Sequence, residues 1–218
     1  MTHTVGVRAA RKLQTRQALL TAALRLMADQ SLGSLSLREV TRAAGLVPAG
    51  FYRHFPDMES LGVAVAGESL GELRLALRAV RAGLTDSEEI IRRSLSVLVR
   101  RVHAHRAEFR FVVRERFGGV RRVQWAIAEE LRLFGVELAS DLLAGRIATV
   151  SDPHRWPPGD LEMLTGLVVD QLLLTVAAIL EVPPDRPAAR RHVLDVAAKR
   201  LRLVVLGGRH WLDPVPSG

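Results

Sequence analysis

The sequence predicts an all-α protein in which residues 1–57 form a small basic domain and residues 58–218 form a larger helical domain. Apolar residues recur at intervals of three and four along most of the chain, which is the spacing of one face of an α-helix. No segment shows the sustained two-residue alternation, bounded by turn residues, that a half-buried strand requires. An apolar content of 48% in 218 residues is enough to bury a substantial core.

Positive charge is concentrated in the first quarter of the chain. Residues 1–55 hold eight basic and two acidic side chains, which gives this segment +6 of the total net charge of +8. A basic segment of this kind is typical of a module that faces a polyanion. Nearly all of the basic residues are Arg, however, and such a bias can be genomic. Charge alone therefore leaves a merely solvated basic helix open.

Composition and the histidine spacing exclude several kinds of site. Cysteine is absent, which excludes disulfides, thiolate metal sites and cysteine nucleophiles. His103 and His105 point about 200° apart on a helix and cannot converge on one ion, so we expect surface histidines, no metal and no cofactor. The opening residues lack the apolar core of a secretory signal, so we expect a cytoplasmic protein.

The first predicted helix runs from about Arg8 to Asp29. Its apolar face is formed by residues spaced i, i+3, i+4 and i+7, namely Leu20, Ala23, Leu24 and Met27. The opposite face carries basic and amide side chains. We therefore expect one face of this helix to pack and the other to meet solvent or phosphate.

A capping box predicts the start of the second helix. In Ser36-Leu37-Arg38-Glu39, the Ser36 side chain can cap the Glu39 amide while the Glu39 carboxylate returns to the Ser36 amide. The helix is expected to stop at Gly45, which can take a left-handed conformation. A short third helix then runs from Pro48 to Phe55, and Pro56 ends it. Two short helices with a glycine turn between them, after a longer basic helix, form the arrangement that places the last helix in a DNA major groove.

The recognition segment that follows Pro48 supplies the candidate contacts to DNA. Phe51 and Phe55, four residues apart, are expected to face the core, while their neighbours face the duplex. For His54, internal packing as a hydrogen-bonded spacer stays an alternative. The candidate DNA-binding residues are Arg16, Ser36, Arg38, Pro48, Ala49, Gly50, Tyr52, Arg53 and His54.

The larger domain is predicted to contain a helix over Met58–Arg81 and helical stretches near Ser87–His105, Ala107–Arg116, Val120–Ala148, Pro158–Glu181 and Ala188–Leu206. The run from Met163 to Leu180 is apolar almost all round its axis. It approaches the length of a membrane span, but Asp170 and Gln171 lie at its centre, where a charge in lipid costs about 3 kcal/mol or more. We interpret it as a dimer-core helix and expect no membrane association.

Aromatic and apolar residues in the middle of the chain are candidates for the lining of a ligand cavity. The candidate ligand-binding residues are Leu95, Leu98, Val99, Phe109, Phe111, Arg114, Trp125 and Phe134. Core packing explains the apolar members equally well. For Arg114, an Arg–Glu surface network is preferred over a contact to a ligand head group.

One motif suggests an enzyme and is set aside. Residues 67–71 fit the G-x-S-x-G pattern of a hydrolase nucleophile elbow, with Ser69 as the nucleophile. That elbow needs a strand before the serine, and this match lies inside a helical run. An acyl-ester hydrolase therefore remains only a remote alternative, and we predict that the chain is not an enzyme.

The stretch SLSLREVTRAAGLVPAGFYRHFPDMESLG resembles the signature of the TetR family of helix-turn-helix regulators. Within that family, VGVRAARKLQTRQAL, SLSLREV, FYRHF and FRFVVRERFGG are most similar to the subgroup typified by FabR and DesT, which represses unsaturated fatty-acid synthesis genes. The similarity is closest over residues 5–65. The RERFGG match and Trp211 extend it more weakly over the whole length.

The resemblance implies a homodimer formed through the C-terminal helices on a near-palindromic double-stranded DNA operator. It also implies an effector pocket among the helices after the DNA-binding domain, which in this subgroup accepts long-chain acyl thioesters. A regulator of the same fold that senses another apolar compound, such as a drug, is the alternative. The chain departs from the family at Met58, where many members carry a phosphate-holding Lys, and at Val47, where a small polar cap is usual. A phosphate clamp here must rely on other groups, for which Arg38, Tyr52 and Arg16 are the candidates.

Overall fold

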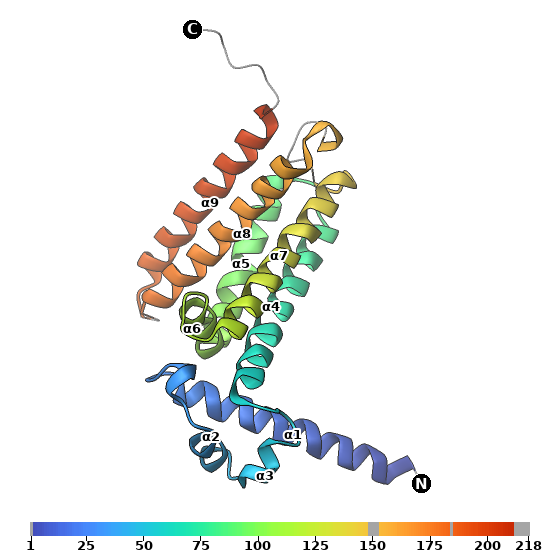
Figure 1. Ribbon diagram of the computed structural model, residues 1–218. Helices are drawn as coiled ribbons and strands as arrows, with labels where there is room; N and C mark the ends of the chain where they lie inside the picture. The colour runs from blue at the N-terminus through green and yellow to red at the C-terminus, as the bar shows by residue number, and fades with distance from the viewer. Residues whose placement is uncertain (1, 148–152, 184, 212–218) are drawn as a thin grey trace. The chain divides into compact units, whose positions relative to one another are not determined.

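The computed structural model describes residues 2–147, 153–183 and 185–211, and these residues form helices and connections without a strand (Figure 1). The all-α prediction is confirmed. The helices are α1 (Thr2–Leu26), α2 (Leu37–Ala43), α3 (Pro48–Phe51), α4 (Met58–Ala82), α5 (Ser87–Ala104), α6 (Arg106–Glu115), α7 (Arg121–Leu143), α8 (Pro158–Glu181) and α9 (Pro187–His210), with single 3-10 turns at Leu32–Ser34 and Pro153–Arg155.

The chain divides into two compact units. Unit 1 contains residues 1–69 and 107–127, and unit 2 contains residues 70–106 and 128–218. The boundary predicted after residue 57 falls inside unit 1. Two continuous helices, α4 and α7, have residues in both units, and α6 belongs almost entirely to unit 1. The helices predicted to bind DNA therefore share a compact unit with a segment from the middle of the chain.

Unit 1 is built around a small apolar core. Leu19, Val40 and Phe51 are completely buried, and Phe111 from α6 is 1% exposed. The apolar face predicted for the first helix is buried as expected, since the relative exposure of Leu20, Ala23, Leu24 and Met27 does not exceed 9%. Burial of these faces stabilises helices that are too short to be stable in isolation.

Unit 2 contains long helices packed lengthwise. The ribbons of α8 and α9 run side by side, and α5 packs against both (Figure 1). An apolar cluster at one end joins these helices to α7 and includes Ile90, Leu142, Trp156 and Leu164. Ile90, Leu142 and Leu164 of this cluster also line the cavity described below.

Several predicted helix bounds are wrong. The last helix ends at His210 rather than near Leu206. The stretch predicted to reach Ala148 ends at Leu143, because Gly145 adopts a left-handed φ of 65° and closes the helix; Ala148 itself lies outside the described residues. The third helix ends at Phe51 rather than Phe55, although the N–H of Phe55 still donates to the Phe51 carbonyl at 3.0 Å. Pro56 disfavours helical backbone at the residue before it. The first helix begins at Thr2 rather than Arg8 and ends at Leu26 rather than Asp29.

The helix α8 is long and apolar enough to cross a membrane by length and composition, with a mean hydropathy of 2.0 over its most apolar window. Only 33% of that window is buried. Asp170 and Gln171 lie in its middle, as the sequence predicts. Several apolar side chains of α8 are therefore exposed, and a dimer interface that would bury them is proposed below.

Candidate DNA interface and effector cavity

The start of α2 is fixed by the predicted capping box. The Ser36 hydroxyl accepts a hydrogen bond from the Glu39 N–H at 3.3 Å, and the Glu39 carboxylate accepts from the Ser36 N–H at 2.9 Å. The Ser36 hydroxyl also donates to the Glu39 carboxylate at 2.6 Å, and this bond, together with the one from the Ser36 N–H, holds the pKa of Glu39 below its usual value. Because both Ser36 groups are used in this way, Ser36 contributes by setting the direction of α2.

The turn between α2 and α3 has the geometry that the sequence predicts. Gly45 has a φ of 67°, where a side chain would be strained, and the Leu46 N–H donates to the Thr41 carbonyl at 2.8 Å. Pro48 occupies the first turn of α3. The turn thus holds α3 against α2 in a helix-turn-helix.

The α3 segment presents polar side chains on one side and buries aromatic rings on the other. Phe51 is completely buried and Phe55 is 3% exposed, and their ring centroids lie 5.7 Å apart. Tyr52 is 61% exposed, and its ring meets Phe51 edge to face. Arg53 is exposed as well. The predicted division between a core face and an outer face is therefore present.

The predicted DNA-binding residues differ in their exposure and in whether they pair with other side chains. Arg38 and Arg53 are exposed and make no hydrogen bond or ion pair within the described part of the chain. Arg16, in contrast, pairs with Glu68, and its guanidinium lies 5.2 Å from the centre of the Phe55 ring. Arg16 thus fastens α1 to α3 and α4 in this structure. Pro48, Ala49 and Gly50 lie at the start of α3 with at least partial exposure.

His54 is half-buried, and its Nδ1 has no hydrogen-bond partner within the described residues. Burial lowers the pKa of His54, and the positive charges of Lys12, Arg16 and Arg53 lower it further. A neutral imidazole that packs inside unit 1 corresponds to the alternative kept open from the sequence. Three basic side chains, those of Lys12, Arg16 and Arg53, lie near this position.

Asp57, next to the N-terminus of α4, pairs with an arginine that the sequence did not indicate. Asp57 accepts from the Ser60 N–H at 2.6 Å and pairs with Arg122 of α7 at 3.2 Å, and these contacts lower its pKa, with the Ser60 bonds as the largest cause. Met58 offers no charge here. Arg122, which is about half exposed, places a guanidinium at this N-terminus from a distant part of the chain. No local pattern around residue 58 indicates it.

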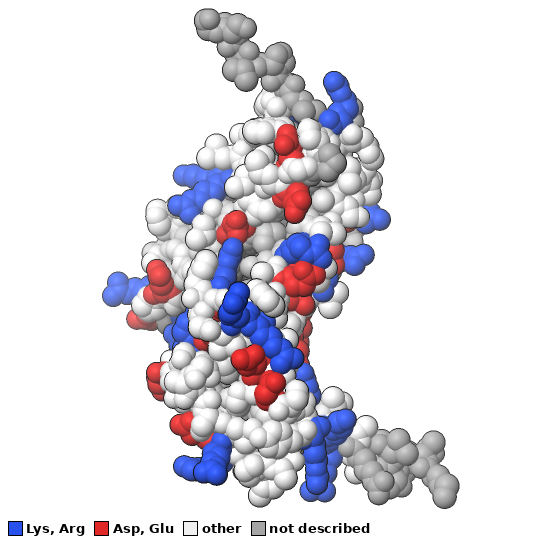
Figure 2. Space-filling view, in the orientation of Figure 1, with Lys and Arg blue, Asp and Glu red and all other residues white. Residues whose placement is uncertain are grey.

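Lys and Arg side chains flank a largely uncharged surface on the part of unit 1 that carries α2 and α3 (Figure 2). An uncharged recognition face between cations is suited to a groove bordered by two phosphate backbones. The charge of the N-terminal segment therefore has the distribution that a DNA-binding face requires.

Within unit 1, two side chains of α6 make hydrogen bonds to the backbone between α1 and α2. The Arg114 guanidinium donates to the Met27 carbonyl at 2.8 Å, beyond the end of α1. The Glu115 carboxylate, which is 1% exposed, accepts from the Leu32 N–H at 3.4 Å and lies 3.3 Å from Arg114 Nε. Arg114, a candidate ligand-binding residue for which pairing with Glu is the preferred interpretation, thus contacts the residue after α1 and Glu115. Phe109 and Phe111 are buried in the same unit, and Trp125 there is 68% exposed.

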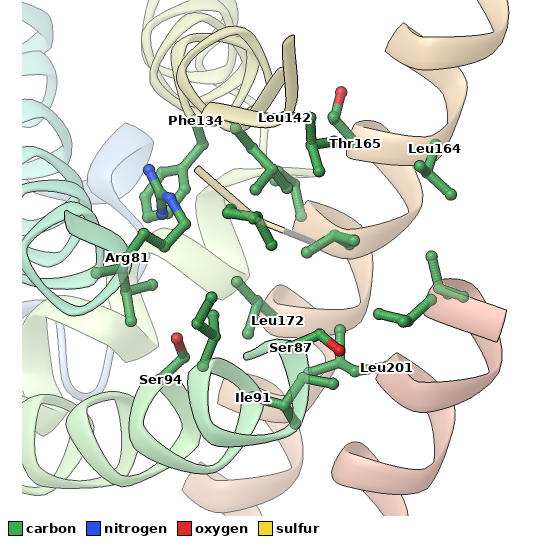
Figure 3. A pocket seen from close by; sticks show the side chains of 18 residues that line it. Arg81, Ser87, Ile91, Ser94, Phe134, Leu142, Leu164, Thr165, Leu172 and Leu201 are labelled. Carbon is green, nitrogen blue, oxygen red and sulfur yellow. The ribbon is translucent and has the colours of Figure 1, made fainter. Parts of the chain in front are cut away.

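Unit 2 holds an apolar cavity of about 90 Å³. Side chains from α4, α5, α7, α8 and α9 line it, among them Leu77, Ile91, Phe134, Leu164 and Leu201 (Figure 3). Phe134 is the one predicted ligand-binding residue among those that line this cavity. Leu95 and Val99 instead line a groove between α5 and α9, and Leu98 is completely buried. The structure therefore does not bring the eight predicted ligand-binding residues together.

One wall of the cavity contains charged groups that the sequence reading did not single out. Arg81 is 6% exposed, and its Nε donates to Asp141 Oδ2 at 2.8 Å. Glu137 pairs with Arg74 and lies 4.0 Å from Arg81 Nη2. The helical spacing was a usable signal, since Arg74, Arg78 and Arg81 share one face of α4, and Glu130, Glu137 and Asp141 share one face of α7.

Ser69 does not have the surroundings of a nucleophile. It lies within α4, and its hydroxyl donates to the Val65 carbonyl one turn earlier at 2.7 Å. The strand and sharp turn of a nucleophile elbow are missing around it. The described residues also contain no group of three or more His, Cys, Asp or Glu side chains arranged to hold a metal ion.

Comparison with solved structures shows the same fold. The fatty acid degradation regulator FadR from Bacillus halodurans superposes with a TM-score of 0.67 at 16% identity, covering 90% of this chain and 97% of that one. FadR from Bacillus subtilis, solved in complex with stearoyl-CoA, gives 0.65 at 13% identity, covering 88% and 98%. GusR from Salmonella enterica gives 0.65 at 19% identity, covering 89% and 96%.

Residues 19–65 match the sequence model of a family described as bacterial regulatory proteins, tetR family. The match spans the second half of α1, the helix-turn-helix and the start of α4. These are the elements that carry the capping box, the glycine turn and the basic side chains described above. Residues 19–65 are thus similar to the DNA-binding domain of tetR family regulators, and the whole chain has the fold of the solved structures above.

Proposed function

We propose that this protein is a cytoplasmic homodimeric repressor that binds a near-palindromic operator and controls genes of lipid or fatty-acid metabolism in response to an acyl thioester. The observation that carries the DNA-binding part is the exposed, unpaired state of Arg38 and Arg53 beside Tyr52 on the helix-turn-helix. In this proposal Arg53 donates to base edges and Arg38 donates to a phosphate. Arg122 takes the role of the Lys that Met58 replaces.

Exposed apolar side chains on α8 and α9 support the homodimer. Met163, Leu167 and Leu174 lie on one stripe of α8 and are 43%, 49% and 60% exposed. Leu203 and Leu206 of α9 are 67% and 43% exposed. A contiguous set of this kind is typical of an interface. A two-fold axis through it gives each dimer two recognition segments, which reach successive major grooves when they are about 34 Å apart.

The apolar lining of the cavity in unit 2 supports an apolar effector, and the cavity volume limits how large that effector can be. At about 90 Å³ the cavity is smaller than the roughly 300 Å³ or more of an ordinary ligand site. A long acyl chain therefore binds only if the helices around the cavity move apart. Switching between mostly bound and mostly free operator requires about 5.5 kcal/mol of differential affinity, which about seven buried methylenes supply at ~0.8 kcal/mol each.

Two helices that line the cavity, α4 and α7, also have residues in the unit that contains the helix-turn-helix. The cavity residues Leu77 and Arg81 belong to α4, the same helix that begins in unit 1, and Phe134 belongs to α7, which also begins there. In unit 1, α6 contacts the residues around the end of α1 through Arg114 and Glu115. An effector that displaces α4 or α7 therefore changes the surroundings of the helix-turn-helix.

The small cavity volume also favours a second candidate, a regulator of the same type that senses a compact apolar compound such as a drug. Such a compound fits with less helix movement. The two candidates differ in which compound changes operator affinity, and FadR from Bacillus subtilis, with its stearoyl-CoA, supports the first.

Fluorescence anisotropy of the protein with DNA from upstream of its own gene tests the proposal, across a salt series and with saturated and unsaturated acyl thioesters. We expect specific binding that weakens steeply with salt and changes when a thioester is added. Arg53→Ala should weaken specific binding, whereas Arg93→Ala, an exposed Arg on α5 that pairs with Glu89, serves as the matched control. Specific binding that ignores thioesters but responds to a compact apolar compound would establish the second candidate. Absence of specific binding would contradict both.

A further inference from the structure

The wall of the unit 2 cavity contains a hydrogen-bond donor without an acceptor. Arg81 Nη2 is buried and makes no hydrogen bond, and Glu137 Oε2, which also makes none, lies 4.0 Å from it. The Arg81 side chain is 7% exposed and extends from α4 towards the cavity (Figure 3). A buried N–H that lacks an acceptor is costly, so a ligand that supplies one gains affinity.

Two of the other polar groups of the lining have partners of their own. The Thr165 hydroxyl donates to the Glu162 carbonyl at 3.1 Å, and the Ser87 hydroxyl accepts from Arg209 at 3.2 Å. Among the described residues that line this cavity, Arg81 is the only charged one. Most of the remaining lining is apolar. The cavity therefore fits a ligand that is apolar except for a single polar group directed at Arg81.

Two carboxylates lie beside the Arg81 guanidinium. Asp141 accepts from Arg81 Nε at 2.8 Å, and Glu137 Oε2 lies 4.0 Å from Nη2. Arg146 also pairs with Asp141, and Arg74 and Arg78 pair with Glu137. A ligand carboxylate beside Nη2 would lose its hydration in this poorly solvated site and would lie close to both acidic side chains. A neutral oxygen needs only the free N–H and meets no such repulsion.

We propose that the cavity binds an apolar ligand through a neutral acceptor oxygen, such as the carbonyl of an ester or thioester, that accepts a hydrogen bond from Arg81 Nη2, and that it rejects the matching carboxylate. This inference rests on the proposed function in one respect, namely that the cavity is the effector site. The expected effectors are esters or other uncharged carbonyl compounds.

Calorimetric titration of the full-length protein tests this with three small probes of similar length: methyl hexanoate, hexanoate and n-heptane. We expect methyl hexanoate to bind at least about 10-fold more tightly than either other probe, which is the ratio that one satisfied charge-assisted hydrogen bond supplies. The infrared carbonyl band of methyl hexanoate should also move to lower frequency on binding.

The variant Arg81→Met/Asp141→Leu removes the donor together with its anion, so no unpaired charge is left in the core. Its helical content by circular dichroism should match that of the natural protein, while the preference for the ester over heptane and the carbonyl shift should both be lost. Arg78→Met is the matched control, because Arg78 lies one turn earlier on α4 and is 56% exposed, and it should keep both.

Three results would overturn the inference: hexanoate binding as tightly as the ester, no binding of the ester, or a preference and a carbonyl shift that survive in the double variant. Operator binding is measured separately with the same protein. An ester that binds through Arg81 but leaves operator affinity unchanged would contradict the proposed effector response and leave the ligand class standing.

Discussion

Gly62 on α4 is a position where adding one methyl group should destabilise unit 1. A Cβ at Gly62 would lie 2.4 Å from Leu32 Cδ2 and 2.9 Å from Val123 Cγ2, both closer than real Cβ contacts. Leu32 is 3% exposed, and Val123 is completely buried and stiff at its branched Cβ. Gly62→Ala therefore forces neighbouring groups to move within a packed core.

Two opposing effects decide the magnitude for Gly62→Ala. Overpacking costs about 1–3 kcal/mol, whereas replacing Gly by Ala in a helix gains about 1 kcal/mol. We expect a net loss of about 1 kcal/mol in the free energy of unfolding. Gly71→Ala is the matched control, since it lies in the same helix and a Cβ there meets no heavy atom of the described residues within 4 Å. That substitution should stabilise by about 0.5–1 kcal/mol.

Urea unfolding followed by circular dichroism, at one protein concentration, measures both variants against the natural chain. The two free energies should differ by about 2 kcal/mol with opposite signs. Gly62→Ala should also weaken operator binding, because Leu32 lies between α1 and α2. Stabilisation by both substitutions would refute the close packing of α4 against Leu32 and Val123, and with it this route from α4 to the helix-turn-helix.

Three further outcomes follow from particular residues. Arg53→Ala should weaken specific operator binding by about 10- to 100-fold, with a smaller effect on non-specific DNA, as measured by anisotropy. Because burial lowers the folded-state pKa of His54, its contribution to stability is present above pH 6.5 and is lost as pH falls below that value. The melting temperature of His54→Gln should therefore fall less between pH 7.5 and 5.5 than that of the natural chain. Leu174→Asp, at a 60% exposed position of α8, should shift sedimentation towards monomer while leaving helical content unchanged. Equal sedimentation of the two proteins would contradict the proposed interface.

Local signals predicted the helix-turn-helix well. The Ser36–Glu39 box, the left-handed Gly45 and the position of Pro48 each depend on residues within a few positions of one another, and the structure has all three. Such interactions are decided by the chain's immediate sequence, so they can be read without knowledge of the fold. The missed end of α7 had a signal of the same kind in Gly145.

The composition of the cavity was harder to predict, because it depends on which helices meet. Phe109, Phe111 and Phe134 are similar as apolar residues of amphipathic helices, yet the first two belong to unit 1 and only Phe134 lines the cavity. Periodicity identifies the buried face of a helix but not its neighbour. The same limit hid Arg122, whose partner Asp57 lies far away in sequence.

The charged pairs between α4 and α7 bear on how the proposed regulator would switch. Removing a buried ion pair in favour of apolar residues is often neutral or stabilising, so the Arg81–Asp141 pair is poorly explained as a source of stability. It does fix the register of α4 against α7, since Arg81 cannot slide along α7 without leaving Asp141. A fixed register gives an effector a defined state to change. A carbonyl that engages Arg81 Nη2 would act at the place where this register is set, on the helix that continues into the DNA-binding unit.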